Sequence, residues 1–277
     1  MPLEVPVTVP VPLRRLVSEI TSVRACAPAG GTPLVHLPDA DTSLIFRTTS
    51  APRSTLLVAG PRTRASYHVG KDFPLCLRLR LRPGAARLLF GVPMTELVDR
   101  VVDLEELWDG AAGLTAPPGD DVRDVLRRLQ AALPARVAAR SNADVARSEL
   151  VRATAQALRD QAGQRREPVA AIARRLAVSE RHMRDLVRDG VGVPPKRMER
   201  IERVRRVLAQ GRGLAGGRGP AGGRVLAGGR AHTARWAQLA AIEGFYDQSH
   251  MTAEFRTLMG VPPAAFFAGR LPSLEPC

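Results

Sequence analysis

Two segments of this chain repeat one residue pattern on either side of a glycine-rich stretch. Residues 172–198 and residues 239–267 each contain a His-Met pair ten residues before a Gly-Val-Pro-Pro run. Apolar side chains in both segments recur at the three- and four-residue spacing of an amphipathic helix. A repeated unit of this size indicates a duplicated supersecondary element. This duplication constrains the fold of the C-terminal half more than any other feature of the sequence.

Each repeat is predicted to be two short helices joined by a tight turn. Ser179 and Asp247 are the expected N-caps of the second helices, because their side chains can accept from backbone N–H groups. The expected buried stripes of these helices are Met183, Leu186 and Val187 in the first unit and Met251, Phe255 and Leu258 in the second. This is the helix-turn-helix, whose second helix enters a DNA major groove. The two motifs are expected at about 169–189 and 233–258.

The opposite faces of the second helices carry side chains that suit DNA. Arginine can bond guanine O6 and N7 or neutralise a phosphate, glutamine suits adenine, and threonine can contact a thymine methyl. A plain solvated face remains the alternative for any single arginine. The candidate DNA-contacting residues on these faces are Arg181, Arg184 and Arg188 in the first unit and Gln248, Ser249, Thr252 and Arg256 in the second.

The repeated half resembles the DNA-binding half of the AraC/XylS transcription regulators over about 150–270, which implies a DNA-binding domain over 150–272. The matching residues are Ile172-Ala173, Val178-Ser179 and Gly192 in the first unit, and Gly244-Phe245, Asp247, Ser249-His250, Phe255-Arg256 and Gly260-Val261-Pro262-Pro263 in the second. The resemblance implies two helix-turn-helix subdomains joined by a long helix, here about 195–209, that read two successive major-groove segments. It implies base-facing positions at Arg181, Arg184, Asp185, Gln248, Ser249 and Ala253.

The chain departs from the family pattern at two of these positions. Many members have arginine where Asp185 and Ala253 stand, so two expected guanine contacts are missing. An aspartate can accept from cytosine N4, although it repels phosphate. The connection before the second unit is also much longer than usual in the family, and a long loop counts against rigid coupling of the two halves.

That connection, residues 211–230, is a repeat of Gly and Arg. Its opening GRGLAG matches the GxGxxG pattern of a dinucleotide-binding turn, which requires a preceding strand and an acidic residue about 20 positions later. The residues before it have helical spacing instead, and no Asp or Glu occurs between Glu202 and Glu243. Glycine at this density does not offset its ordering entropy. We therefore predict a flexible tether and no bound cofactor.

The N-terminal half has the pattern of a small antiparallel sheet followed by helices. Apolar and β-branched residues separated by Pro, Asp and Gly predict strands within 34–82, and the pattern is helical over 84–140. The run LCLRLRLR alternates, which predicts one buried and one wet face. The expected buried residues are Leu75, Leu77, Leu79 and Leu81, and the expected wet ones are Cys76, Arg78, Arg80 and Arg82. The expected fold class is α+β.

Residues 82–108 also resemble the domain that precedes the DNA-binding half in many actinobacterial AraC-type proteins. This resemblance implies that residues 1–140 form a sensor or dimerisation domain. It implies a small-molecule effector and a homodimer as partners, without identifying the effector.

Charge supports a polyanionic partner, since the formal net charge is +14. Residues 141–277 hold 23 basic and 13 acidic side chains, so the excess lies in the repeated half. Double-stranded DNA is the expected partner. The alternative is a nonspecific nucleic-acid binder that uses the Gly-Arg repeats, although 211–230 contains no aromatic residue for base stacking.

No enzyme motif such as GxSxG, HExxH or a P-loop occurs, so we expect a protein that is not an enzyme. Cys26, His36, His68 and Cys76 could form a soft-metal site. Their irregular spacing favours small buried cysteines instead, and no metal is expected. The sequence has no apolar run of the ~18 residues that span a bilayer and no signal-peptide pattern at its start. The expected location is the cytoplasm.

Overall fold

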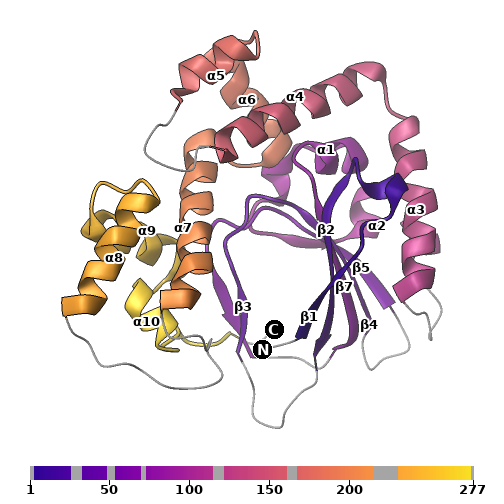
Figure 1. The fold of residues 1–277 in the computed structure, drawn as a ribbon. Helices are drawn as coiled ribbons and strands as arrows, with labels where there is room; N and C mark the ends of the chain where they lie inside the picture. Colours follow the sequence, from indigo (N-terminus) through magenta and orange to yellow (C-terminus); the bar gives the residue numbers. More distant parts are fainter. Residues whose placement is uncertain are drawn as a thin grey trace.

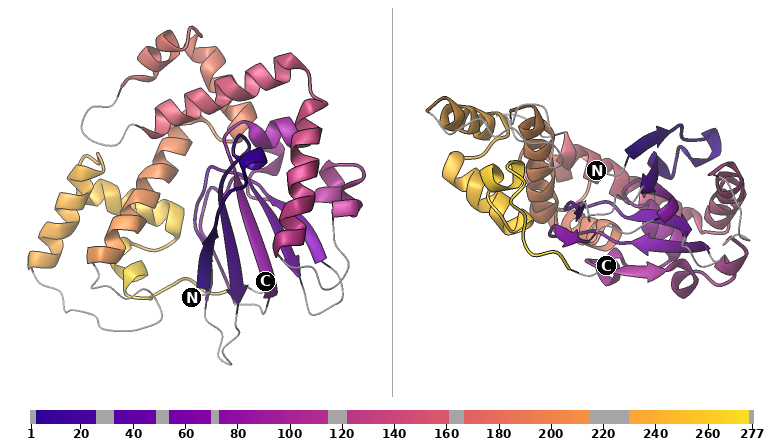
Figure 2. Two further views of the ribbon diagram at one scale, coloured as in Figure 1. Left: turned by 45° about the vertical axis from the view of Figure 1, so that its right-hand side comes forward. Right: turned by 90° about the horizontal axis from the view of Figure 1, so that it is seen from below.

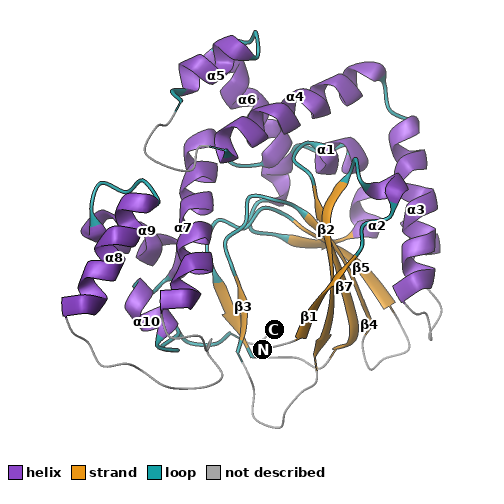
Figure 3. Ribbon diagram, in the orientation of Figure 1, coloured by secondary structure: helices purple, strands orange, loops and turns teal. Residues whose placement is uncertain are grey.

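The computed structural model describes residues 3–25, 33–48, 54–69, 73–114, 122–160, 167–214 and 230–275. The fold is α+β, with an antiparallel β-rich N-terminal part followed by a helical C-terminal part (Figures 1 and 3). Among the described residues, no helix is both long and apolar enough to cross a membrane.

The larger sheet has six antiparallel strands in the order β1-β2-β7-β4-β5-β8, and β3 and β6 form a separate two-stranded sheet. In Figure 1, β3 lies beside the helical half. The strands are β1 (Leu3–Val7), β2 (Val17–Ala25), β3 (Leu34–His36), β4 (Ser43–Thr48), β5 (Ser54–Ala59), β6 (Ser66–His68), β7 (Phe73–Leu81) and β8 (Val101–Asp103).

The alternating run forms β7, which lies between β2 and β4. Its leucines point to the buried face, as predicted: Leu77 and Leu79 are 0% exposed, and Leu75 is half-buried. They belong to a core that includes residues of α1 (Ala85–Phe90) and α3 (Val122–Ala138). Helix α3 lies along the sheet in Figure 2. Period-two alternation on β7 is thus explained by helices covering one face of the sheet.

The other face of β7 is not uniformly wet, and this part of the prediction was wrong. The side chain of Arg80 is only 14% exposed. Its guanidinium lies 2.7 Å from carboxylate oxygens of both Asp39 and Asp41, in the connection between β3 and β4. Two carboxylates from a distant part of the sequence therefore cover an arginine that the alternation places in solvent.

The sheet also extends beyond the predicted range of 34–82. A bulge between Val17 and Glu19 breaks the two-residue period, so buried Val17 and Ile20 lie three residues apart, which hides β2 from a search for alternation. Strand β8 interrupts the range predicted to be helical, and it begins two residues after Asp99, which has a φ of 57°. A left-handed residue cannot continue a right-handed helix.

The remaining described helices are short 3-10 helices and α-helices, and all of them except η1 follow residue 90. Helix α4 begins before residue 150, and its Val151, Ala155 and Leu158 join the core of the first repeat. The elements are η1 (Val11–Leu13), η2 (Met94–Leu97), α2 (Leu104–Leu107), η3 (Ala111–Leu114), α4 (Asn142–Arg159), α5 (Val169–Arg175), α6 (Glu180–Val191), α7 (Pro195–Leu214), α8 (Arg230–Ile242), α9 (Gln248–Met259) and α10 (Pro263–Phe267).

Candidate nucleic-acid interface

The first repeat folds as helix α5, a short turn and helix α6. Ser179 caps α6, because its hydroxyl accepts from the backbone N–H of His182 at 3.1 Å. The predicted stripe is buried: Met183, Leu186 and Val187 are each at most 1% exposed and pack with Ile172 of α5. The sequence therefore located both the cap and the core face of this unit.

The turn between α5 and α6 contains a residue in the left-handed region. Ala177 has a φ of 55°, whereas the corresponding turn of the second unit uses Gly244 with a φ of 72°. An L-residue pays roughly 1–2 kcal/mol for this conformation because its Cβ approaches the backbone. The duplicated turn therefore has a relaxed glycine in one copy and a strained alanine in the other.

We expect Ala177→Gly to raise the free energy of unfolding by about 0.5–1 kcal/mol, because the relieved strain exceeds the entropy that glycine loses on folding. Ala171→Gly, inside helix α5, is the matched control and should lower stability by about 1 kcal/mol. Denaturant titration of both variants measures the difference. Equal losses in the two variants would contradict a strained turn at Ala177.

The second repeat folds in the same way as α8, a turn at Gly244, and α9. Asp247 caps α9 by accepting from the N–H of His250 at 2.7 Å. Its buried residues match the predicted stripe and extend onto α8 and α7. They include Trp236, Leu239, Ala240, Met251, Phe255 and Leu258, with Ile201, Val204 and Val207 from α7.

The candidate contact residues on α6 form an exposed, mostly basic face. Arg181, Asp185 and Arg188 are exposed, and the Arg184 side chain is 59% exposed. The Arg184 guanidinium lies 2.6 Å from the Glu180 carboxylate one turn earlier. An exposed pair of this kind holds its partners weakly, so Arg184 remains able to exchange Glu180 for a base or a phosphate.

On α9 the candidate residues are less uniformly exposed. Ser249 and Arg256 are exposed, as is Ala253, whereas Gln248 and Thr252 are half-buried. This face carries one arginine where α6 carries three, so its chemistry is that of hydroxyl and amide groups. Contacts to adenine edges and thymine methyls suit such a face better than phosphate neutralisation does.

Two buried carboxylates, which the sequence analysis did not single out, attach the second unit to α7. Glu254 lies on α9 with a side chain 3% exposed, and its oxygens lie 3.2 Å from Arg200 Nε and 2.8 Å from Arg203 Nη2. Glu243, at the end of α8, accepts from Arg206 and Gln210, both at 2.5 Å. Two sequence features could have predicted these pairs. Arginines recur three residues apart in the α7 segment, and an acidic residue stands within the apolar stripe of α9.

These ion pairs change the interpretation of charge and of the long connection. Arginines of α7 neutralise carboxylates of the protein, so the net charge overstates the positive charge that is available to a polyanionic partner. They also join the second unit to α7 through buried bonds. Whether the two units are rigidly coupled stays a prediction, but these contacts connect the second unit to α7 without using residues 211–230.

The glycine-rich connection is shorter than the sequence pattern indicated, because α7 continues to Leu214 and α8 starts at Arg230. Gly211, the first glycine of GxGxxG, lies in the helix, and a Cβ built there would meet the Phe267 ring at 2.4 Å. Close packing explains this glycine, and no strand precedes it. The rest of the predicted 211–230 tether, residues 215–229, lies outside the described residues.

The structure describes only three of the four residues considered for a metal site. Cys26 lies outside the described residues, and His36 and His68 are in edge contact across β3 and β6, with ring centroids 5.5 Å apart. Burial, aided by Arg62, His68 and Arg78, lowers the pKa of His36 to about 4. No cluster of three or more His, Cys, Asp or Glu side chains suited to a metal occurs within the described ranges.

Comparison with known proteins gives structural similarity alone. No family model matches the chain, and no curated protein sequence matches it. A crystal structure of ToxT from Vibrio cholerae O395 is similar with a TM-score of 0.40 and 10% identity, covering 92% of this chain and 97% of that one. An unsaturated-fatty-acid-bound structure of wild-type ToxT from strain SCE256 has a TM-score of 0.37 and 9% identity, covering 93% and 97%.

Proposed function

We propose that this chain is a sequence-specific DNA-binding transcriptional regulator of the AraC/XylS type. In this proposal α6 and α9 each enter one of two successive major-groove segments. The observation that carries it is the duplicated helix-turn-helix, in which two capped helices bury one face and expose a polar face at matching positions. If the polar faces of α6 and α9 were only solvated surface, the chain would have no need to repeat the same caps, cores and turns in two units.

The N-terminal part is proposed to be a sensor or dimerisation domain over 1–140, joined to a DNA-binding domain over 150–272 whose first core also includes α4. A small-molecule effector and a second copy of the chain are its proposed partners, and the cytoplasm its proposed location. The proposal assigns no catalytic reaction and no cofactor. Its DNA contacts are Arg181, Arg184, Asp185, Arg188, Gln248, Ser249, Thr252 and Arg256.

Arg184→Ala tests base readout on α6. If this guanidinium bonds a base, we expect a loss of about 1–3 kcal/mol on the best site and a relaxed preference at one position of that site. The measurement is selection of bound duplexes from a random pool, followed by titration of the best duplex and its single-base variants. A uniform loss over all sequences would instead assign Arg184 to a phosphate.

Arg127→Ala is the matched control for this experiment. Arg127 lies on α3 and pairs with Asp124 at 3.0 Å within the same helix, so the substitution deletes the same charge and the same kind of exposed ion pair. We expect the control to leave sequence preference unchanged. Failure of the wild-type chain to enrich any sequence over competitor DNA would reject the proposed function in favour of nonspecific binding.

A further inference from the structure

Both proposed recognition helices end against the same short segment of the N-terminal half. This segment, which we call the 60–67 connection, comprises the loop between β5 and β6 and the first two residues of β6, and it has the sequence GPRTRASY. It contacts the C-terminal end of α6 near its start and the C-terminal end of α9 near its finish. The ends of α6 and α9, which are far apart in the sequence, therefore both pack against the 60–67 connection.

At the α6 end, the contact is close packing at the helix C-cap. Gly192 has a φ of 94°, and a Cβ built there would lie 2.8 Å from the carbonyl oxygen of Met94 and 3.0 Å from Cγ of Pro61. Just after this cap, Arg197 of α7 donates to the carbonyl of Thr63 at 2.9 Å. The start of the 60–67 connection therefore packs, together with Met94 of η2, against the C-cap of α6 and bonds the first turn of α7.

At the α9 end, the contact is a pair of hydrogen bonds to the last turn of the helix. The backbone N–H of Ala65 donates to the carbonyl of Leu258 at 2.7 Å, and the hydroxyl of Tyr67 donates to the carbonyl of Met259 at 2.5 Å. The last carbonyls of a helix lack partners within it. Tyr67 is buried, and burial raises its pKa to about 12, so it carries this proton at neutral pH.

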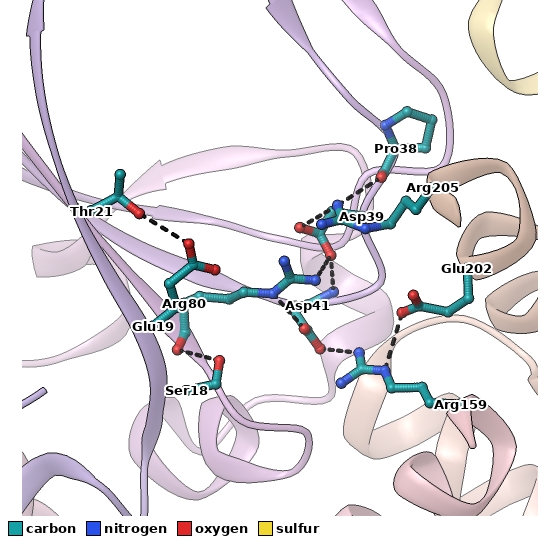
Figure 4. A network of polar contacts seen from close by, with 10 residues as sticks. All are labelled: Ser18, Glu19, Thr21, Pro38, Asp39, Asp41, Arg80, Arg159, Glu202 and Arg205. Carbon is teal, nitrogen blue, oxygen red and sulfur yellow. Dashed lines mark hydrogen bonds and ion pairs between the residues drawn. The ribbon is translucent and has the colours of Figure 1, made fainter. Parts of the chain in front are cut away.

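The 60–67 connection is itself held in place. Asp99 accepts from the N–H and the hydroxyl of Thr63, both at 2.6 Å, and Arg62 and Asp39 exchange two backbone hydrogen bonds. Asp39 also pairs with Arg205 of α7 at 2.9 Å, and Asp41 pairs with Arg159 of α4 (Figure 4). The 60–67 connection is thus tied to α7 through Asp39, and the neighbouring Asp41 pairs with α4.

The contacts lie at the ends of α6 and α9 and leave their outer faces free. Arg181 and Arg188 on α6, and Ser249 and Arg256 on α9, are exposed while both helices are docked. Docking that covered these faces would compete with DNA. Docking at the C-terminal ends holds the helices in orientation without occupying the groove-facing side.

We infer that the 60–67 connection sets the mutual orientation of α6 and α9, with Tyr67 as the positioning residue at the α9 end. This rests on the proposed function, because it concerns the spacing between the two groove segments that the helices read. One extra base pair rotates the second segment by roughly 35° and moves it by roughly 3.4 Å. A protein whose two helices are fixed should tolerate such a change poorly.

The test compares the spacing preference of the wild type with that of Tyr67→Phe, which keeps the ring and removes the hydrogen bond to Met259. The best site is prepared with one or two base pairs inserted or removed between its segments, and the dissociation constant is measured for each duplex. We expect the wild type to lose at least about tenfold in affinity per changed base pair. Tyr67→Phe should reduce that loss by at least about threefold.

Tyr246→Phe is the matched control, because it deletes the same hydroxyl from a tyrosine that is 92% exposed in the α8–α9 turn. The control should keep the wild-type spacing profile. Amide hydrogen exchange at Ala65, whose N–H bonds the end of α9, should accelerate in Tyr67→Phe alone. This readout does not depend on DNA.

An unchanged spacing profile in Tyr67→Phe, together with a sharp profile in the wild type, would overturn the inference and assign the orientation to α7. A wild-type chain with no sequence preference at all would overturn the proposed function and this inference with it. The two failures are therefore distinguishable in one set of titrations.

Discussion

Asp41→Asn should lower the free energy of unfolding by about 3 kcal/mol, because removing one member of a buried ion-pair network leaves its partners uncompensated. The Asp41 side chain is 3% exposed and pairs with Arg80 at 2.7 Å and with Arg159. Each arginine keeps one other carboxylate, Asp39 or Glu202, which places the loss at the lower end of the usual range of about 3–5 kcal/mol. Denaturant titration measures this loss.

The loss should not depend on pH near neutrality. Burial alone would raise the pKa of Asp41, but the guanidinium groups of Arg159 and Arg80 outweigh it and hold the pKa below its ordinary value. Stabilisation by this carboxylate is complete above the unfolded-state pKa of about 3.9 and disappears as the pH falls through the folded-state pKa. The wild-type and variant stabilities should therefore converge only in acid.

Asp124→Asn is the matched control, since Asp124 is 40% exposed and pairs with an exposed arginine. An exposed pair contributes about 0–1 kcal/mol, so this variant should stay close to the wild type. Equal losses from Asp41→Asn and Asp124→Asn would mean that the network in Figure 4 does not join the two halves.

Local patterns in the sequence were enough to locate the helical units and the central strand. The caps Ser179 and Asp247 and the leucines of β7 were predicted correctly, because a cap depends on residues three positions away and a strand face on a period of two. The same local logic missed β2, where a bulge changes the period.

The partners of the arginines could not be predicted in this way. Arg80 and Arg203 are as basic in sequence as Arg181, yet the first two face buried carboxylates and the last is exposed. Which carboxylate meets which arginine depends on sheet register and on the packing of α7, and both are set by contacts between distant residues. Charge counts therefore indicate a polyanionic partner without identifying the residues that meet it.

Met251→Asp should have the largest effect on the second unit, with a loss of at least about 4 kcal/mol in its local stability. Met251 is 0% exposed, and the core around it is formed by α8, α9 and one face of α7. Removing a buried methionine costs about 2–5 kcal/mol through the lost contacts and the cavity. An unpaired carboxylate in the same place adds a desolvation penalty.

The unfolding should be confined to α8 and α9, because the core of the larger sheet is a separate cluster with its own helices. Amide hydrogen exchange resolves this: protection should disappear in α8 and α9 and persist in β7. Met251→Leu is the control, and a volume-conserving change of this kind costs less than about 1.5 kcal/mol. If Met251→Asp kept α9 protected, the assignment of its buried stripe would be wrong. Loss of protection in β7 as well would show that the two halves unfold as one cooperative unit.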